Sequence, residues 1–179
     1  MSSFFKISLL CSLSSLLLWG CSSMPAGTAQ PGTSIHSVTA EGIGGSLGKV
    51  YFQDSSRGLV ITTDLHQLPP GDHGFHIHEQ GSCAPAEKDG KMQAALAAGG
   101  HFNPTQVAHH GTPMTGHLGD LPVLHVNTQG EAKTVLLAPR LKLADIQGRA
   151  IMIHADGDNY SDLPKPLGGG GTRIACGVI

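Results

Sequence analysis

Aromatic and charged residues are both scarce in this sequence. Only 4% of the 179 residues are aromatic and 13% are charged, whereas there are 25 glycines and 11 prolines. This balance favours a turn-rich β protein over a helical one. The formal net charge is −2, and lysine and arginine form no cluster. The lack of a basic patch argues against a nucleic acid partner.

Long hydrophobic runs are also lacking, except near the N-terminus. There Lys6 precedes a mostly apolar stretch, residues 7–19, which is too short to span a bilayer comfortably. It ends in Leu-Trp-Gly-Cys at residues 18–21, which resembles a bacterial lipobox because a small residue directly precedes the cysteine. We therefore predict a lipoprotein signal peptide at residues 1–20 and a lipid on Cys21. The alternatives are ordinary cleavage near Ala26 and an uncleaved anchor.

The predicted anchor implies a place in the cell. Residues 21–34 consist mainly of Ser, Gly, Pro, Thr and Ala, which predicts a flexible tether. Residues 35–179 are long enough for one folded domain. Ser22 follows Cys21 where an aspartate would favour retention in the inner membrane. We expect a periplasmic domain anchored by lipid, more readily to the outer membrane.

Cysteine is nearly absent from the predicted domain. Of four cysteines, Cys11 falls in the signal peptide and Cys21 at its end, which leaves Cys83 and Cys176. Two cysteines in an exported domain predict one disulfide. The alternative is a zinc-thiolate site, which is disfavoured because neither cysteine belongs to a C-x-x-C pair.

Short apolar or alternating runs recur between turn signals in the domain. Such runs predict strands of an antiparallel sandwich or barrel. The eight predicted strands are residues 35–40, 47–54, 58–66, 73–78, 121–127, 132–137, 149–154 and 172–177. Two long segments, 79–120 and 155–171, interrupt them without a convincing strand, and residues 92–98 could form one helical turn at most. Loops of this length are usually functional.

Histidines gather around these two loops. Along a strand His76 and His78 point to the same face, with Phe75 and Ile77 toward the core. The other clustered candidates are His101, His110, His117, Asp120 and His154. Six histidines and one aspartate are too many for one ion, so we predict two ions that share one histidine. By contrast, four histidines without partners are predicted to be ordinary surface or boundary residues, and His109 is ambiguous. Those four are His36, His66, His73 and His125.

Four motifs in this order resemble the copper/zinc superoxide dismutase family, especially its bacterial exported branch. The motifs are Gly74–Glu79, Gly99–Pro104, His117–Asp120 and Gly168–Ile179. The resemblance runs from about residue 35 to the C-terminus. It implies an all-β domain, an eight-stranded antiparallel Greek-key barrel or sandwich with two long functional loops.

The resemblance also implies a role for each candidate. Copper would be bound by His76, His78, His101 and His154, and zinc by His101, His110, His117 and Asp120. His110 is preferred to His109 because His110 to Pro113 match the family's His-x-x-Pro spacing. Asp158 would link His76 to His110, Cys83 and Cys176 would form the disulfide, and Arg173 would place a guanidinium beside the copper.

The implied activity is the conversion of superoxide to oxygen and hydrogen peroxide by alternate reduction and reoxidation of copper. His101 would bridge the two ions and deliver a proton to the nascent peroxide. Superoxide is the expected partner, together with the membrane through Cys21, and a homodimer is possible. The alternative is a copper-handling lipoprotein without catalysis. Loss of a copper ligand or of Arg173 would favour it, and the sequence retains them all.

Overall fold

The computed structural model describes Met1 and residues 31–179. The predicted signal peptide, the lipidation site Cys21 and most of the predicted tether lie outside the described residues. Within the described part of the chain, no helix has the length and apolar character needed to cross a membrane.

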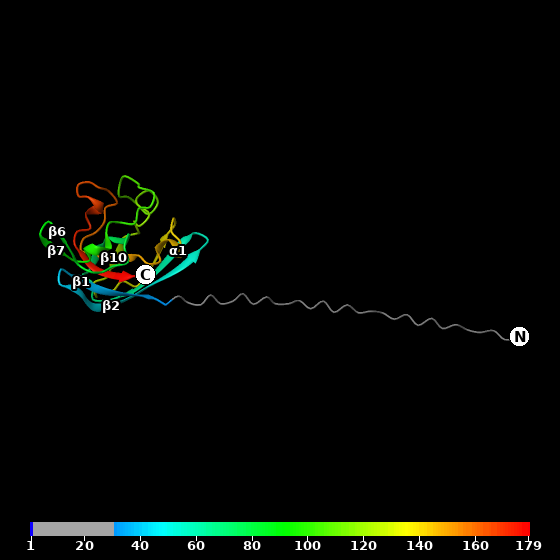
Figure 1. The fold of residues 1–179 in the computed structure, drawn as a ribbon. Coiled ribbons are helices and arrows are strands. Elements are labelled where there is room, and N and C mark those ends of the chain that lie inside the picture. Colours follow the sequence, from blue (N-terminus) through cyan, green and yellow to red (C-terminus); the bar gives the residue numbers. More distant parts are fainter. Residues whose placement is uncertain (2–30) are drawn as a thin grey trace.

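The described residues form an almost entirely β structure (Figure 1). It contains eleven short strands, one α-helical turn and two 3-10 turns. The strands are β1 (Thr33–Thr39), β2 (Gly42–Ser55), β3 (Gly58–Leu65), β4 (Gly71–His73), β5 (Phe75–His78), β6 (Ala86–Lys88), β7 (Lys91–Gln93), β8 (Leu124–Val126), β9 (Val135–Ala138), β10 (Ala150–His154) and β11 (Arg173–Val178). The helical turns are η1 (Leu96–Ala98), α1 (Leu143–Ile146) and η2 (Leu167–Gly169).

Seven of the strands form one antiparallel sheet in the order β5-β10-β11-β1-β2-β3-β9, and β4–β8 and β6–β7 form separate pairs. Because side chains alternate between the two faces along each strand, apolar residues at alternate positions form the buried face of the sheet. In β3, for example, Leu59, Ile61 and Leu65 are buried, whereas Asp64 between them is exposed. Their side chains join Phe75 and other apolar residues in the main core. The loops before β8 and before β11 lie together on one side of the sheet (Figure 1).

The prediction of an antiparallel all-β domain is confirmed, with two differences in detail. The predicted strand 73–78 is divided at Gly74 into β4 and β5, which pair with different strands. The loop 79–120, predicted to contain no strand, includes the hairpin β6–β7. Asp89 and Gly90 form its turn with φ of 55° and 73°, and Asp-Gly is a typical hairpin turn. Sequence reasoning missed this signal because the flanking residues are charged.

The predicted disulfide is confirmed. Cys83, just after β5, is bonded to Cys176 in β11, with 5.7 Å between the Cα atoms. The bond therefore joins the start of the first long loop to the middle of the sheet, and the zinc-thiolate alternative is wrong.

The free edge of β5 is covered by the first long loop. The Ile77 N–H donates to the Gly119 carbonyl (2.9 Å), and the Phe102 N–H donates to the Ile77 carbonyl (2.8 Å). A Cβ on residue 119 would overlap the Ile77 carbonyl, so only glycine permits this approach. These backbone bonds bring His101 and Asp120 alongside His76 and His78.

Candidate metal centre

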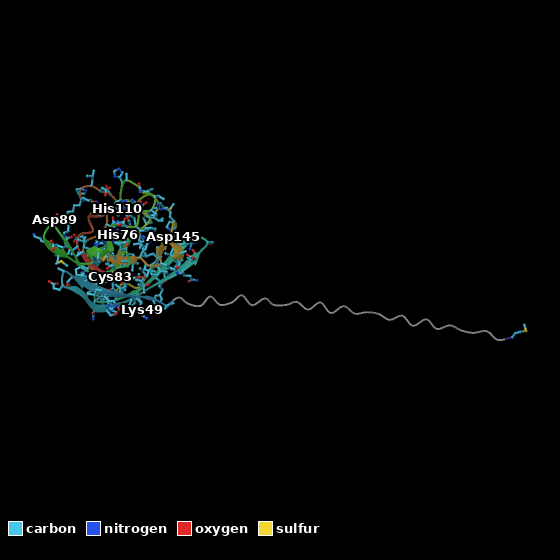
Figure 2. All side chains as sticks on the ribbon, in the orientation of Figure 1. Lys49, His76, Cys83, Asp89, His110 and Asp145 are labelled. Carbon is cyan, nitrogen blue, oxygen red and sulfur yellow. A yellow bond between two sulfur atoms is a disulfide. The ribbon has the colours of Figure 1, made fainter. Side chains whose placement is uncertain are left out.

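The seven predicted ligands converge beneath the two long loops. His76 and His78 come from β5 and His154 from the end of the neighbouring β10, while the remaining four come from the first loop. Figure 2 shows His76 and His110 enclosed by the fold. All seven residues are buried. Burial of so many polar rings is unusual unless each has a partner.

The side chains form two overlapping groups that could each hold a metal ion. In the first, one nitrogen from each of His76, His78, His101 and His154 lies within 4.8 Å of the others. The second contains His76, His101, His110 and Asp120. The His76 Nε2 is already 2.7 Å from Asp158, so its remaining nitrogen can serve only one ion. The family resemblance described above implies the first group for this nitrogen.

His117 lies next to the second group rather than within it. Its Nδ1 is 3.4 Å from Asp120 Oδ1. His101 contacts the same carboxylate through Nδ1, at 2.9 Å, which leaves its Nε2 for the first group. The arrangement thus places His101 between the two groups.

Five buried ring nitrogens have no hydrogen-bond partner among the described residues. They are His76 Nδ1, His78 Nε2, His110 Nδ1, His117 Nδ1 and His154 Nε2. The His110 Nδ1 is 3.0 Å from Asp120 Oδ2 but lacks hydrogen-bond geometry. All five belong to predicted ligands. A buried polar atom without a partner is costly, and a metal ion is the partner that would use a neutral imidazole nitrogen.

In four of these rings, the other ring nitrogen makes a hydrogen bond within the protein. The His78 Nδ1–H donates to the Gly99 carbonyl (3.0 Å) and the His154 Nδ1–H to the Gly171 carbonyl (3.2 Å). Asp158 accepts from His76 Nε2 at 2.7 Å and from His110 Nε2 at 2.8 Å. Hydrogen bonds of this kind fix the tautomer and orientation of metal-binding histidines.

A glycine makes room for the Asp158 carboxylate. Gly168 has φ of 71°, and a Cβ at this position would overlap the carboxylate of Asp158 and approach the His110 ring. Gly168 begins a run of four glycines, of which Gly169 and Gly171 also have positive φ. Its first residue therefore permits contact between the two long loops.

Burial keeps three rings of the first group neutral. It lowers the pKa of His76 and His78 well below the ordinary histidine value, and a positive charge on His101 would lower it further. Burial also lowers the pKa of His154 to about 4. Neutral rings are the form that binds a metal. These three histidines are therefore ready to act as ligands at neutral pH.

His110 and the two carboxylates beside it have the opposite electrostatic character. Burial lowers the pKa of His110, but the nearby carboxylates of Asp120 and Asp158, the latter hydrogen-bonded to the ring, outweigh this and raise the pKa to about 9. Burial alone would raise the pKa of the Asp120 and Asp158 carboxyls. Contacts with neighbouring histidines, His110 among them, outweigh burial and bring both pKa values below the usual range. The two carboxylates therefore remain ionised and attract a cation.

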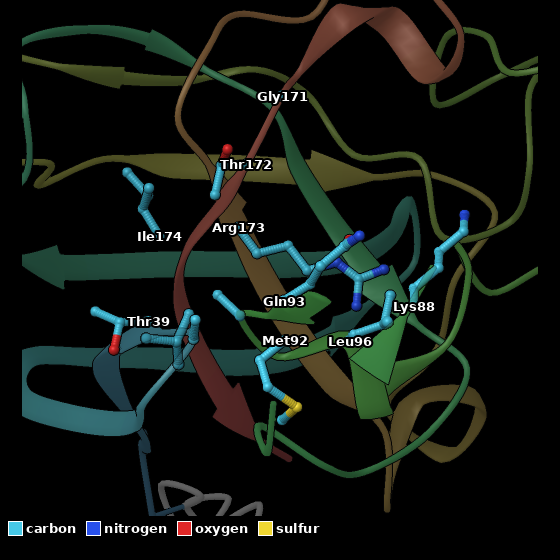
Figure 3. Close-up of a pocket in the computed structure, with 12 residues that line it drawn as sticks. Thr39, Lys88, Met92, Gln93, Leu96, Gly171, Thr172, Arg173 and Ile174 are labelled. Atoms are coloured by element: carbon cyan, nitrogen blue, oxygen red, sulfur yellow. The ribbon is translucent and has the colours of Figure 1, made fainter. Parts of the chain in front are cut away.

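Arg173 lies where two cavities meet. One, of about 280 Å³, is lined by His78, His101, His154 and Arg173 among others. The other is a groove of about 750 Å³ whose walls include Arg173, Lys88 and Met92 (Figure 3). The Arg173 guanidinium donates to the carbonyls of Ala95 and Gly99, both at 2.6 Å. A fixed cation thus stands beside the cavity that reaches the first histidine group.

The structure corrects the prediction for His73 and places the ambiguous His109. His73 is buried, and its two ring nitrogens each lie 2.7 Å from a carbonyl oxygen, of Pro69 and of His154. It is therefore not a surface or boundary residue without partners. His109 is exposed and contacts Asp162 at 3.2 Å, and it belongs to neither histidine group. Likewise, the exposed His125 has a partner, Asp72 at 2.9 Å. No sequence signal identifies the carbonyl partners of His73.

The chain is similar to known proteins over most of its length. The Copper/zinc superoxide dismutase (SODC) family profile matches residues 46–179. Superoxide dismutase [Cu-Zn] of Escherichia coli strain K12 is 56% identical over 144 residues, which cover 79% of this chain and 83% of the relative. Superoxide dismutase [Cu-Zn] 2 of Salmonella typhimurium is 52% identical over 170 residues, 94% of this chain and 97% of the relative.

Solved structures agree with the sequence comparisons. The Cu/Zn superoxide dismutase from Brucella abortus is 48% identical, with a TM-score of 0.81, and the match covers 83% of this chain and 98% of that structure. The monomeric enzyme from Salmonella enterica is 54% identical, with a TM-score of 0.74 and the same coverage. The sequence motifs, the curled antiparallel sheet and the two histidine groups lead to one conclusion: this chain belongs to the copper/zinc superoxide dismutase family.

Proposed function

We propose that the two groups of side chains bind copper and zinc separately, so that the chain dismutates superoxide in the cell envelope. Membership of the family carries the activity: two superoxide anions and two protons give oxygen and hydrogen peroxide. The assignment of individual residues is supported above all by the five buried ring nitrogens without partners.

We assign copper to His76 Nδ1, His78 Nε2, His154 Nε2 and the Nε2 of His101. The first three are among the nitrogens without partners. Zinc is assigned to His101 Nδ1, His110 Nδ1, His117 Nδ1 and Asp120. A set of three histidines and one carboxylate suits zinc, and an all-imidazole set suits copper. His101 belongs to both sets because its Nδ1 faces Asp120 and its Nε2 is free to face the copper histidines.

The protein's own groups guide the anion and the proton. When bound, copper supplies one-electron redox chemistry, whereas zinc has no redox chemistry and supplies fixed charge. Arg173 offers permanently charged donors to an anion in the cavity beside His78 and His154. When it is not bound to copper, His101 Nε2 would hold a proton and release it to the peroxide. Asp120, which contacts Nδ1, keeps the ring oriented during that transfer.

Two single substitutions should separate the metals. His154→Ala should lose copper and retain zinc, while His110→Ala should lose zinc and retain more copper, since each removes a ligand of one group only. His125→Ala, an exposed histidine with an aspartate partner, is the matched control and should retain both. Metal content per chain after dialysis, measured by mass spectrometry, tests the assignment. Equal loss of both metals from His154→Ala and His110→Ala would contradict it.

The proposed position in the envelope depends on Cys21. Cys21→Ala should release the protein from membranes without reducing its specific activity, because a lipid at this position would be separated from the metal ligands by more than fifty residues. Cys11→Ala, which changes the other cysteine of the N-terminal segment, should leave the protein bound. Labelling with a radioactive fatty acid and membrane fractionation check this result. A wild-type protein that is soluble and unlabelled would exclude the lipid anchor.

A further inference from the structure

Five of the six candidate metal-binding histidines are oriented by a hydrogen bond to the ring, and His117 is the exception. The other five rings each contact a carboxylate or a backbone carbonyl. Among the described residues, the His117 ring makes no hydrogen bond. Its side chain is also more exposed, at 11%, than that of His110, at 0%. In the part of the chain that the structure describes, the only polar contact of the His117 ring is the longer one between Nδ1 and Asp120 Oδ1, at 3.4 Å.

The His117 backbone makes two short hydrogen bonds to side chains. Its N–H donates to Asp120 Oδ2 (2.8 Å), and its carbonyl accepts from Arg140 Nη2 (2.8 Å). The same Nη2 donates to the Gly116 carbonyl (2.9 Å), and the Nε donates to the Pro113 carbonyl (2.7 Å). One guanidinium thus holds the peptide units on both sides of His117. Three bonds from one planar group hold the backbone, and the backbone sets the position from which the His117 side chain extends.

The segment that carries Arg140 is anchored to the core of the domain. Arg140 lies between β9 and α1, and the adjacent Leu141 is buried in the main core. Nearby, the Lys142 Nζ donates to the Ser55 carbonyl (2.7 Å), and the Leu143 N–H donates to Asp54 (2.9 Å). This segment is therefore anchored to the β2–β3 hairpin. The half-buried guanidinium forms no ion pair with any described residue, so its polar contacts are directed at the loop.

We propose that Arg140 is a positioning residue for zinc: it holds the loop 113–117 so that His117 faces Asp120. The proposal rests on the assignment of His117 to zinc made above. Lysine cannot replace this function fully, because an ammonium lacks the planar fork that reaches carbonyls on two sides. Loss of a group that supports a metal ligand typically costs 10–100-fold in metal affinity.

The test compares release of zinc from the metal-loaded protein into an excess of chelator. Arg140→Gln should release zinc on the order of 10-fold faster or more, and Arg140→Lys should fall between it and wild type. Lys142→Gln, which removes a carbonyl contact from the same segment but not from the loop, should match wild type. With cobalt in place of zinc, the visible absorption bands should shift in Arg140→Gln and not in Lys142→Gln.

His117→Ala separates the two hypotheses. If it retains zinc like wild type, the assignment of His117 is wrong and the proposal fails with it. If it loses zinc while Arg140→Gln releases zinc at the wild-type rate, only the role of Arg140 is overturned. Melting temperatures distinguish positioning from a merely structural role. If Arg140 were only structural, Arg140→Gln would lower the melting temperatures of the metal-free and the zinc-loaded protein equally. A larger loss with zinc bound supports positioning.

Discussion

His101→Ala is expected to have the largest effect of any single substitution, a loss of both metals together with the activity. His101 and His76 both belong to the two groups, but His76 Nε2 is taken by Asp158. His101 can therefore offer one nitrogen to each ion, Nδ1 on the side of Asp120 and Nε2 on the side of the proposed copper histidines. Its removal also takes away the proposed proton donor. Since groups that only support a ligand cost roughly 10–100-fold in affinity, a shared ligand should cost more for each ion.

Metal analysis and a dismutation assay on the same preparation measure this effect. His66→Ala changes an exposed histidine outside both groups and should retain metals and rate. The His101→Ala variant should remain folded, because the main core does not contain His101. A His101→Ala protein that retained both ions and dismutated superoxide at the wild-type rate would refute the shared-ligand assignment.

Removal of the disulfide is expected to have the largest effect on stability. The Cys83–Cys176 bond closes a loop with a sequence separation of 93 residues. By the chain-entropy model, a loop of this size stabilises the folded state by about 4–5 kcal/mol, because it restricts the unfolded chain. The double variant Cys83→Ser, Cys176→Ser should lose most of that free energy of unfolding. Urea unfolding of the metal-free protein measures it without the contribution of bound ions.

Wild-type protein treated with a thiol reductant is the matched control for the double variant. Both should show a lowered urea midpoint, because both lack the cross-link. The midpoint of the double variant should be the lower of the two, because it also replaces two buried sulfur atoms of a core cluster with hydroxyls. An unchanged midpoint in the double variant would show that the denatured chain is not restricted by this bond. An effect confined to the reduced wild type would contradict the prediction equally.

The sequence predicts the part of the site that depends on periodicity. Because side chains alternate along a strand, His76 and His78 had to share a face, and the structure shows this with Phe75 and Ile77 in the core. The long loops were identified by the absence of strand-length apolar runs. The cysteine pair followed from arithmetic, since only two cysteines remain in the domain.

The groups that orient the ligands could not be predicted in the same way. Arg140 and His73 act on backbone carbonyls, and every residue has a carbonyl, so the partner leaves no mark in the sequence. Asp162 is similar: it accepts from the backbone N–H groups of His110 and Leu167, which are far apart in the chain. Only the folded path of the loops reveals such contacts.

The loop that covers the free edge of β5 also matters for self-association. β5 is an outermost strand of the seven-stranded sheet, and its outer hydrogen-bonding groups are occupied by the backbone of Phe102 and Gly119. These two residues directly adjoin His101 and Asp120, so the segments that carry two candidate ligands also close this edge of the sheet. An open strand edge is a template for pairing with another copy of a chain. Because Ile77 is already paired on its outer side, a second copy could add a strand to β5 only by displacing the backbone of both loop segments.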